Sequence, residues 1–86
     1  MQFYNLTYGE RIMIIRKRVG LTKKELAELC GTTVSVISKM ENSMPNPDNK
    51  ILANIAFVLN VTANMLIFGF DDAKKNQPLE GLIKNA

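Results

Sequence analysis

The chain has 86 residues, of which 47% are apolar and 22% charged, and it contains one cysteine and no histidine. This length suits a single small domain, and the composition is typical of a soluble globular protein. The lack of histidine and the lone thiol exclude most zinc sites, Ser-His-Asp and Cys-His nucleophiles, and a disulfide within the chain. We therefore expect no enzyme activity, no metal and no cofactor, in a protein of the reducing cytoplasm.

The excess positive charge is confined to the first half of the chain. Residues 1–50 hold eight Lys and Arg against five Asp and Glu, whereas residues 51–86 hold three of each, so the net charge of +3 arises before residue 51. A surface that binds phosphate is therefore sought there. Residues 51–70 carry no charge, but Asn60, Val61 and Thr62 interrupt them, which predicts two buried helices and not a membrane span.

Start and stop signals predict the first two helices. Thr7 and Thr22 are each followed three residues later by glutamate, which is the spacing of a capping box. Gly20 and Gly31 are the matching stop signals. The apolar positions expected to face the core are Ile12, Ile15, Val19, Leu26, Ala27 and Cys30.

Three further helices follow. Thr33 is a natural N-cap for the third, and the two prolines of residues 43–47 predict a loop after it. Asp48 and Thr62 can begin the fourth and the fifth, which ends at Gly69. The expected inward positions of the third and fourth helices are Val36, Ile37, Met40, Ile51 or Leu52, Ile55, Ala56 and Leu59. The fifth helix contains the apolar residues Met65, Leu66 and Phe68.

The resulting fold class is all-α, with five short helices. The second and third helices are joined by a tight turn at Gly31, which is typical of the helix-turn-helix unit. Ala27 is a small residue where these two helices would cross. On these grounds alone, a DNA-binding unit and any other small helical bundle remain equally open.

A series of short motifs lies within residues 8–68, in an order and at spacings that leave no gaps in the comparison with a known family. The motifs are GERI at 9–12, RKRVGLT at 16–22, ELAE at 25–28, GTTVSVISKMEN at 31–42, NP at 46–47, Leu52, IA at 55–56 and LNVT at 59–62. In this order they resemble the Cro/C1-type (XRE-family) helix-turn-helix domain of bacterial and phage regulators. The resemblance implies a lambda-repressor-like DNA-binding domain at residues 8–69, preceded by an N-terminal arm at 1–7 and followed by a C-terminal tail at 70–86.

The resemblance makes residues 33–41 the recognition helix, which lies in the major groove. The positions that face the bases in the family correspond here to Thr33, Val34, Ser35, Ser38 and Lys39. Val34 suits a thymine methyl group, and Lys39 suits a guanine or a phosphate. The alternative for Ser35 and Ser38 is a solvated helix surface, and for Thr33 a purely capping role.

The resemblance also implies contacts to DNA phosphates from Lys23, Lys24, Asn42 and Arg16. Lys23 stands where the family often has glutamine, so a steeper salt dependence is expected, although both lysines also fit an ordinary charged helix start. Arg16 is expected first of all to form a partly buried ion pair with Glu41. Residues 43–45 lack the glycine and the basic residues that are frequent in the family, so fewer phosphate contacts are expected from this loop.

These features favour a sequence-specific regulator of transcription, a homodimeric repressor that binds pseudo-palindromic double-stranded DNA. The candidate dimer contacts are Met65, Ile67, Phe68, Phe70, Leu79, Leu82 and Ile83. The last three mark an amphipathic turn that either adds to the dimer or stays unstructured. The alternative function is an antitoxin or anti-repressor type of module, which binds a toxin or another protein antagonist through the apolar C-terminal third.

Overall fold

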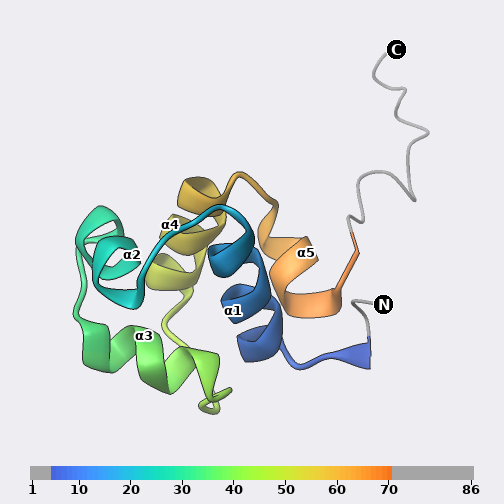
Figure 1. Cartoon of the computed structure of the whole chain (residues 1–86). Helices are drawn as coiled ribbons and strands as arrows, with labels where there is room; N and C mark the ends of the chain where they lie inside the picture. Colours follow the sequence, from blue (N-terminus) through green and yellow to red (C-terminus); the bar gives the residue numbers. More distant parts are fainter. Residues whose placement is uncertain (1–4, 71–86) are drawn as a thin grey trace.

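The computed structural model describes residues 5–70, which form five α-helices (Figure 1). The helices are α1 (Tyr8–Arg18), α2 (Lys23–Cys30), α3 (Val34–Glu41), α4 (Asn49–Leu59) and α5 (Ala63–Phe68). Within this described part there is no strand, so the all-α prediction is confirmed. None of these five helices is long and apolar enough to cross a membrane.

Each helix begins at the capping residue that the sequence predicts. The side chains of Thr7, Thr22, Thr33, Asp48 and Thr62 all accept hydrogen bonds from backbone N–H groups of the first turn that follows. In α1 and α2 the glutamate of the first turn also accepts from the N-cap N–H, which completes both predicted capping boxes. These bonds satisfy donors that a helix start leaves without an intrahelical partner.

The glycine stops lie where the sequence predicts them. Gly20, Gly31 and Gly69 take the left-handed conformation at the ends of α1, α2 and α5, and Asn60 ends α4 in the same way. Helix α1 has Arg18 as its last residue and Val19 as its C-cap, directly before Gly20. Val19 is consequently 50% exposed and does not extend the inner face of α1, so its assignment to the core was wrong.

The core joins all five helices. Its buried apolar members are Ile12, Ile15, Leu26, Ala27, Cys30, Ile37, Met40, Leu52, Ile55, Ala56, Leu59 and Leu66. Leu52, and not the half-buried Ile51, therefore fills the first inward position of α4. Phe68, a candidate dimer contact, is 51% exposed. Leu66 takes the inward position of the short helix α5, and two residues further on a helix turns by about 200°, so Phe68 points outwards.

Helix α1 lies between the α2–α3 pair and α5 (Figure 1). Its closest approach to α3 is at Gly9, where a Cβ atom would come within 2.4 Å of the Met40 carbonyl oxygen and 2.5 Å of the Glu41 carbonyl oxygen. Both atoms belong to the backbone and cannot rotate away. The sequence therefore needs glycine at this point for α1 to pack on the end of α3.

We expect Gly9→Ala to destabilise the protein by about 1–3 kcal/mol, because the added methyl group overpacks a backbone contact. At an uncrowded helix position the same substitution would stabilise by up to about 1 kcal/mol. Urea unfolding followed by circular dichroism measures the difference, with Lys17→Ala on the exposed side of α1 as a near-neutral control. A Gly9→Ala variant at least as stable as the wild type would contradict the packing described here.

Candidate nucleic-acid interface

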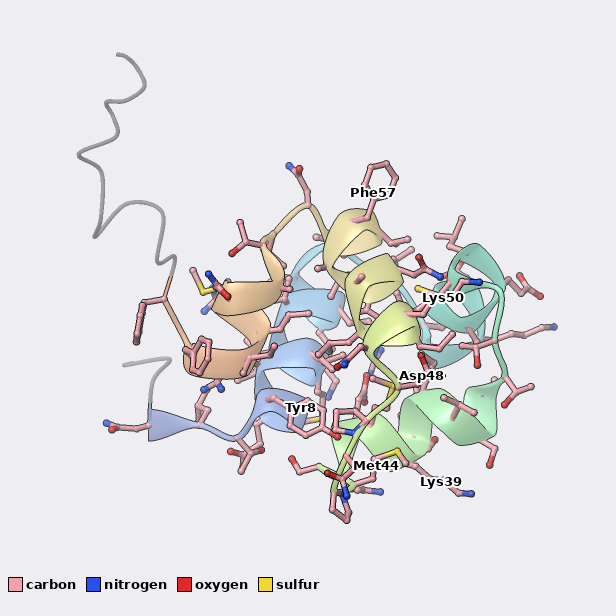
Figure 2. All side chains as sticks on the ribbon, turned by 180° about the vertical axis from the view of Figure 1, so that it is seen from behind. Tyr8, Lys39, Met44, Asp48, Lys50 and Phe57 are labelled. Carbon is pink, nitrogen blue, oxygen red and sulfur yellow. The ribbon has the colours of Figure 1, made fainter. Side chains whose placement is uncertain are left out.

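The third helix presents one buried and one exposed face. Ile37 and Met40 are fully buried, and Glu41 is 7% exposed. The opposite face carries the sequence-derived base-contact candidates, of which Thr33, Val34, Ser35 and Lys39 are exposed and Ser38 is half-buried. In Figure 2 Lys39 projects on the opposite side of the molecule from Phe57 of α4. No acidic side chain lies among these exposed positions of α3.

A tight turn holds α3 against α2. Gly31 adopts a φ of 71°, where a glycine has no Cβ penalty, and the Thr32 N–H donates to the Ala27 carbonyl at 2.9 Å. Ala27 is 2% exposed in the core beside this turn. The Asn54 side-chain amide of α4 donates to the Cys30 carbonyl at 3.2 Å, which ties the end of α2 to α4. The turn and the end of α2, from which α3 continues, are thus held by one backbone and one side-chain hydrogen bond.

The start of α2 adjoins the exposed face of α3. The Lys23 ammonium donates to the Ser38 hydroxyl at 3.4 Å, so a cation from one helix lies against the outward surface of the other. Lys24 follows as an exposed side chain. The N–H groups at the start of α2 and its positive dipole end add to the positive potential at this point. The structure therefore places Lys23, one of the candidate phosphate contacts, against α3.

An open depression beside α3 places Asn42 with Lys23. It has a volume of about 410 Å³ and is lined by Thr7, Glu10, Met13, Lys23, Glu41, Asn42 and Ser43. Glu41 is paired with Arg16, whereas Glu10 accepts from the Thr7 N–H at 2.9 Å through one oxygen and stays exposed. The depression therefore contains both the cation of Lys23 and the exposed carboxylate of Glu10.

Arg16 and Glu41 form the ion pair that the sequence suggested. Arg16 Nε donates to Glu41 Oε2 at 2.6 Å and Nη2 donates to Oε1 at 3.3 Å, while Nη1 donates to the Leu21 carbonyl at 2.8 Å. The two side chains are 8% and 4% exposed. All three guanidinium nitrogens thus have protein partners. The contact from Arg16 to a DNA phosphate stays a prediction.

The loop after α3 is held by the start of α1, which the sequence analysis did not anticipate. The Tyr8 hydroxyl donates to the Met44 carbonyl at 2.6 Å, and burial raises the pKa of this phenol, which keeps it protonated as a donor. The Ser43 hydroxyl donates to Thr7 Oγ1 at 2.8 Å and accepts from the Gly9 N–H at 3.3 Å. Ser43 and Asn46 have φ values of 61° and 53°, so the loop has a defined and strained path.

A helix-turn-helix family matches residues 12–66 of this chain. The chain belongs to the Cro/C1-type (XRE) helix-turn-helix family. The family resemblance inferred from the motifs is therefore confirmed. The transcriptional regulator DicA of Escherichia coli is 31% identical over 80 residues, which are 93% of this chain, and the chain spans 59% of the length of DicA.

Two solved structures of the family are similar to this chain. The P22 c2 repressor in complex with a synthetic operator has a TM-score of 0.71 at 26% identity, covering 76% of this chain and 98% of the repressor chain. The SinR/SinI protein complex has a TM-score of 0.68 at 28% identity, covering 91% of this chain and 80% of the other. These matches confirm the lambda-repressor-like fold. The proteins concerned are regulators of transcription and not enzymes.

The end of α5 exposes an apolar surface in this family member. Ile67, Phe68 and Phe70 are 41%, 51% and 36% exposed, and Met65 beside them is half-buried. The rings of Phe68 and Phe70 stack with their centroids 6.1 Å apart. We call these four residues the α5 surface. The other three candidate dimer contacts, Leu79, Leu82 and Ile83, lie outside residues 5–70.

A second buried arginine was missed by the sequence analysis. Arg11 is 3% exposed, and its guanidinium donates to backbone carbonyls of Leu6, Leu66 and Ile67. Burial lowers the pKa of this guanidinium, while the carboxylate of Glu10 acts in the opposite direction. An arginine beside an apolar helix face looks like a solvated residue in the sequence. That Arg11 has backbone carbonyl groups as partners is visible only once the position of α5 beside α1 is known.

We expect Glu41→Ala and Arg16→Met each to destabilise the protein by about 3–5 kcal/mol, because each leaves one buried charge without its partner. The double variant should lose clearly less than the sum of the two, since it removes both charges together. A double-mutant cycle of urea unfolding measures this coupling. Strictly additive losses would show that the two side chains do not act as a pair.

Proposed function

We propose that this protein is a sequence-specific double-stranded DNA-binding regulator of transcription, which reads its site through the major groove with residues 33–41. The observation that carries the proposal is the exposed face of α3, which lacks acidic residues and adjoins Lys23 of α2. An α-helix fits the major groove, and a cation beside it fits the neighbouring phosphates.

Each proposed base contact has chemistry suited to a base edge. Val34 is 42% exposed at the start of α3, where it can pack on a thymine methyl group, and Lys39 can donate to guanine O6 or N7. Ser35 and Ser38 can donate to or accept from several bases and so add little discrimination by themselves. Thr33 already caps α3 through the Val36 N–H, and a DNA contact is a second role for it.

The proposed phosphate contacts lie beside this face. Lys23 of α2 and Asn42, just after α3, line the same depression next to the helix, and Lys24 follows Lys23 as an exposed side chain. Arg16 pairs with Glu41, the residue before Asn42, and is proposed to support the site through it. The arrangement follows the general rule that phosphate contacts orient the protein while base contacts specify the sequence.

We further propose that the protein acts as a homodimeric repressor on a pseudo-palindromic operator. The α5 surface concentrates exposed apolar side chains at the end of the domain away from α2 (Figure 1). The rings of Phe68 and Phe70 stack in this surface, and exposed clusters of apolar side chains mark protein interaction sites. A two-fold dimer also doubles the contacts of a small recognition helix, which alone binds DNA weakly.

The alternative is a module whose main ligand is another protein, such as an antitoxin or an anti-repressor. The similarity of this protein to a chain of the SinR/SinI protein complex is the observation that favours this function. Substitution of the α3 face separates the two proposals. A protein-interaction module would keep its function when α3 loses its base-contacting side chains, whereas a DNA-reading regulator would not.

Selection of random DNA duplexes by the purified protein at about 150 mM salt tests the main proposal. We expect an inverted repeat whose half-sites are about one helical turn apart. Retention that depends only on salt and enriches no motif would show that the basic face is non-specific. The search for a ligand would then move to a protein partner of the α5 surface.

We expect the triple variant Val34→Ala, Ser35→Ala, Lys39→Ala to lose about 100-fold or more of its affinity for the recovered site, while its binding to unrelated DNA changes far less. Fluorescence anisotropy with both duplexes measures the ratio. Phe57→Ala on the opposite side of the molecule is the control and should bind as the wild type does. Equal losses on both duplexes would refute base recognition by α3.

We expect Lys23→Gln and Lys24→Gln each to reduce the slope of log affinity against log salt by about one, because each variant releases about one counterion fewer on binding. Lys17→Gln, at an exposed position in the last turn of α1, is the matched control. Affinities at four salt concentrations give the slope. A slope that neither substitution changes would remove these lysines from the phosphate contacts.

A further inference from the structure

The first turn of α1 contacts the ends of two helices that have separate roles in the proposed function. Tyr8 and Gly9 contact the end of α3 and the loop after it. Arg11, in the same turn, contacts the end of α5. The recognition helix and the α5 surface are thus both fixed to one turn of one helix.

The contact with α3 is tight. Gly9 packs directly on the carbonyl groups of Met40 and Glu41, where even a Cβ atom would come within 2.5 Å of each oxygen. The Tyr8 hydroxyl holds the loop after α3 through the Met44 carbonyl at 2.6 Å. The last turn of α3 and the loop that follows it are therefore both packed on the first turn of α1.

The first turn of α1 contacts the end of α5 through the planar guanidinium group of Arg11. Arg11 Nε donates to the Leu66 carbonyl at 2.6 Å and Nη2 donates to the Ile67 carbonyl at 2.5 Å. The same guanidinium also donates to the Leu6 carbonyl, so it holds the segment before α1 as well as the end of α5. These acceptors lie in the last turn of α5, where carbonyl groups lack intrahelical partners and a cation is favoured. Helix α5 has only six residues, of which Leu66 is the buried one, so Arg11 is a main determinant of its position.

We infer that residues 8–11 set the distance and angle between α3 and the α5 surface, and thereby the half-site spacing that the dimer accepts. The inference rests on the proposed dimer through the α5 surface. A two-fold dimer places its two recognition helices at a separation fixed by the path from the dimer contact to α3. In this domain that path runs from Ile67 through Arg11 and Gly9 to Met40. Arg11 is a positioning residue for operator recognition and touches no base itself.

The test uses the full chain and the operator recovered by selection, with versions that have one base pair more or fewer between the half-sites. One base pair moves a half-site by about 3.4 Å and turns it by about 34°, so the wild type should prefer the recovered spacing by about tenfold or more. Arg11→Lys keeps the charge but loses the planar set of donors. We expect its preference to fall to about threefold or less, with affinity for an isolated half-site within about twofold of the wild type.

Arg18→Lys, the same substitution at an exposed position of α1, is the matched control and should keep the wild-type preference. An undiminished preference in Arg11→Lys would overturn the inference. A uniform loss of affinity for all duplexes, half-site included, would also overturn it, because it would assign Arg11 a role in stability alone. A wild type without any spacing preference would refute the proposed dimer itself. That result is seen in the wild type alone, so it is distinguished from a failure of the inference, which is seen in the variant.

Tyr8→Phe provides a second variant if circular dichroism shows that Arg11→Lys does not fold. It removes the one hydroxyl that donates to Met44 and keeps the ring. We expect a smaller reduction of the spacing preference in the same direction, again with the half-site affinity unchanged. A Tyr8→Phe variant with the spacing preference of the wild type would contradict the inference, because it would show that the contact between Tyr8 and Met44 does not affect the spacing.

Discussion

The buried ion pair between Arg16 and Glu41 is the interaction on which the geometry of the site depends. It places a charge pair, 8% and 4% exposed, between the second half of α1 and the last turn of α3. The remaining nitrogen of Arg16 donates to Leu21, just before α2. Helices α1 and α3 and the segment that leads into α2 therefore meet at one guanidinium. Such a pair adds little net stability relative to apolar residues, but it tolerates only one arrangement of its partners.

That arrangement gives α3 an inner and an outer face. Its inner residues Ile37 and Met40 complete the core, while Val34, Ser35 and Lys39 on the outer face are exposed. The lysines that we propose as phosphate contacts belong to α2, and Lys23 reaches Ser38 on α3 across the turn at Gly31. The proposed function thus divides phosphate contacts and base contacts between two helices that one tight turn connects.

Much of this domain follows from local sequence signals. The five N-caps and the glycine stops at Gly20, Gly31 and Gly69 were predicted correctly because capping depends on a few adjacent residues. Val19 was misplaced because the helical spacing was extended past the last residue of the helix. The ion pair was found only through the family resemblance, since its members are 25 residues apart.

The sequence by itself therefore determined the helices, their order and the residue types available to α3, because these depend on contacts within a turn or two. Only the tertiary structure decided what Gly9, Tyr8 and Arg11 do. Their partners are backbone carbonyl groups, which every residue carries and which no pattern of side chains reveals. Which carbonyls they meet depends on how α3 and α5 pack on α1, and that packing is a property of the whole core.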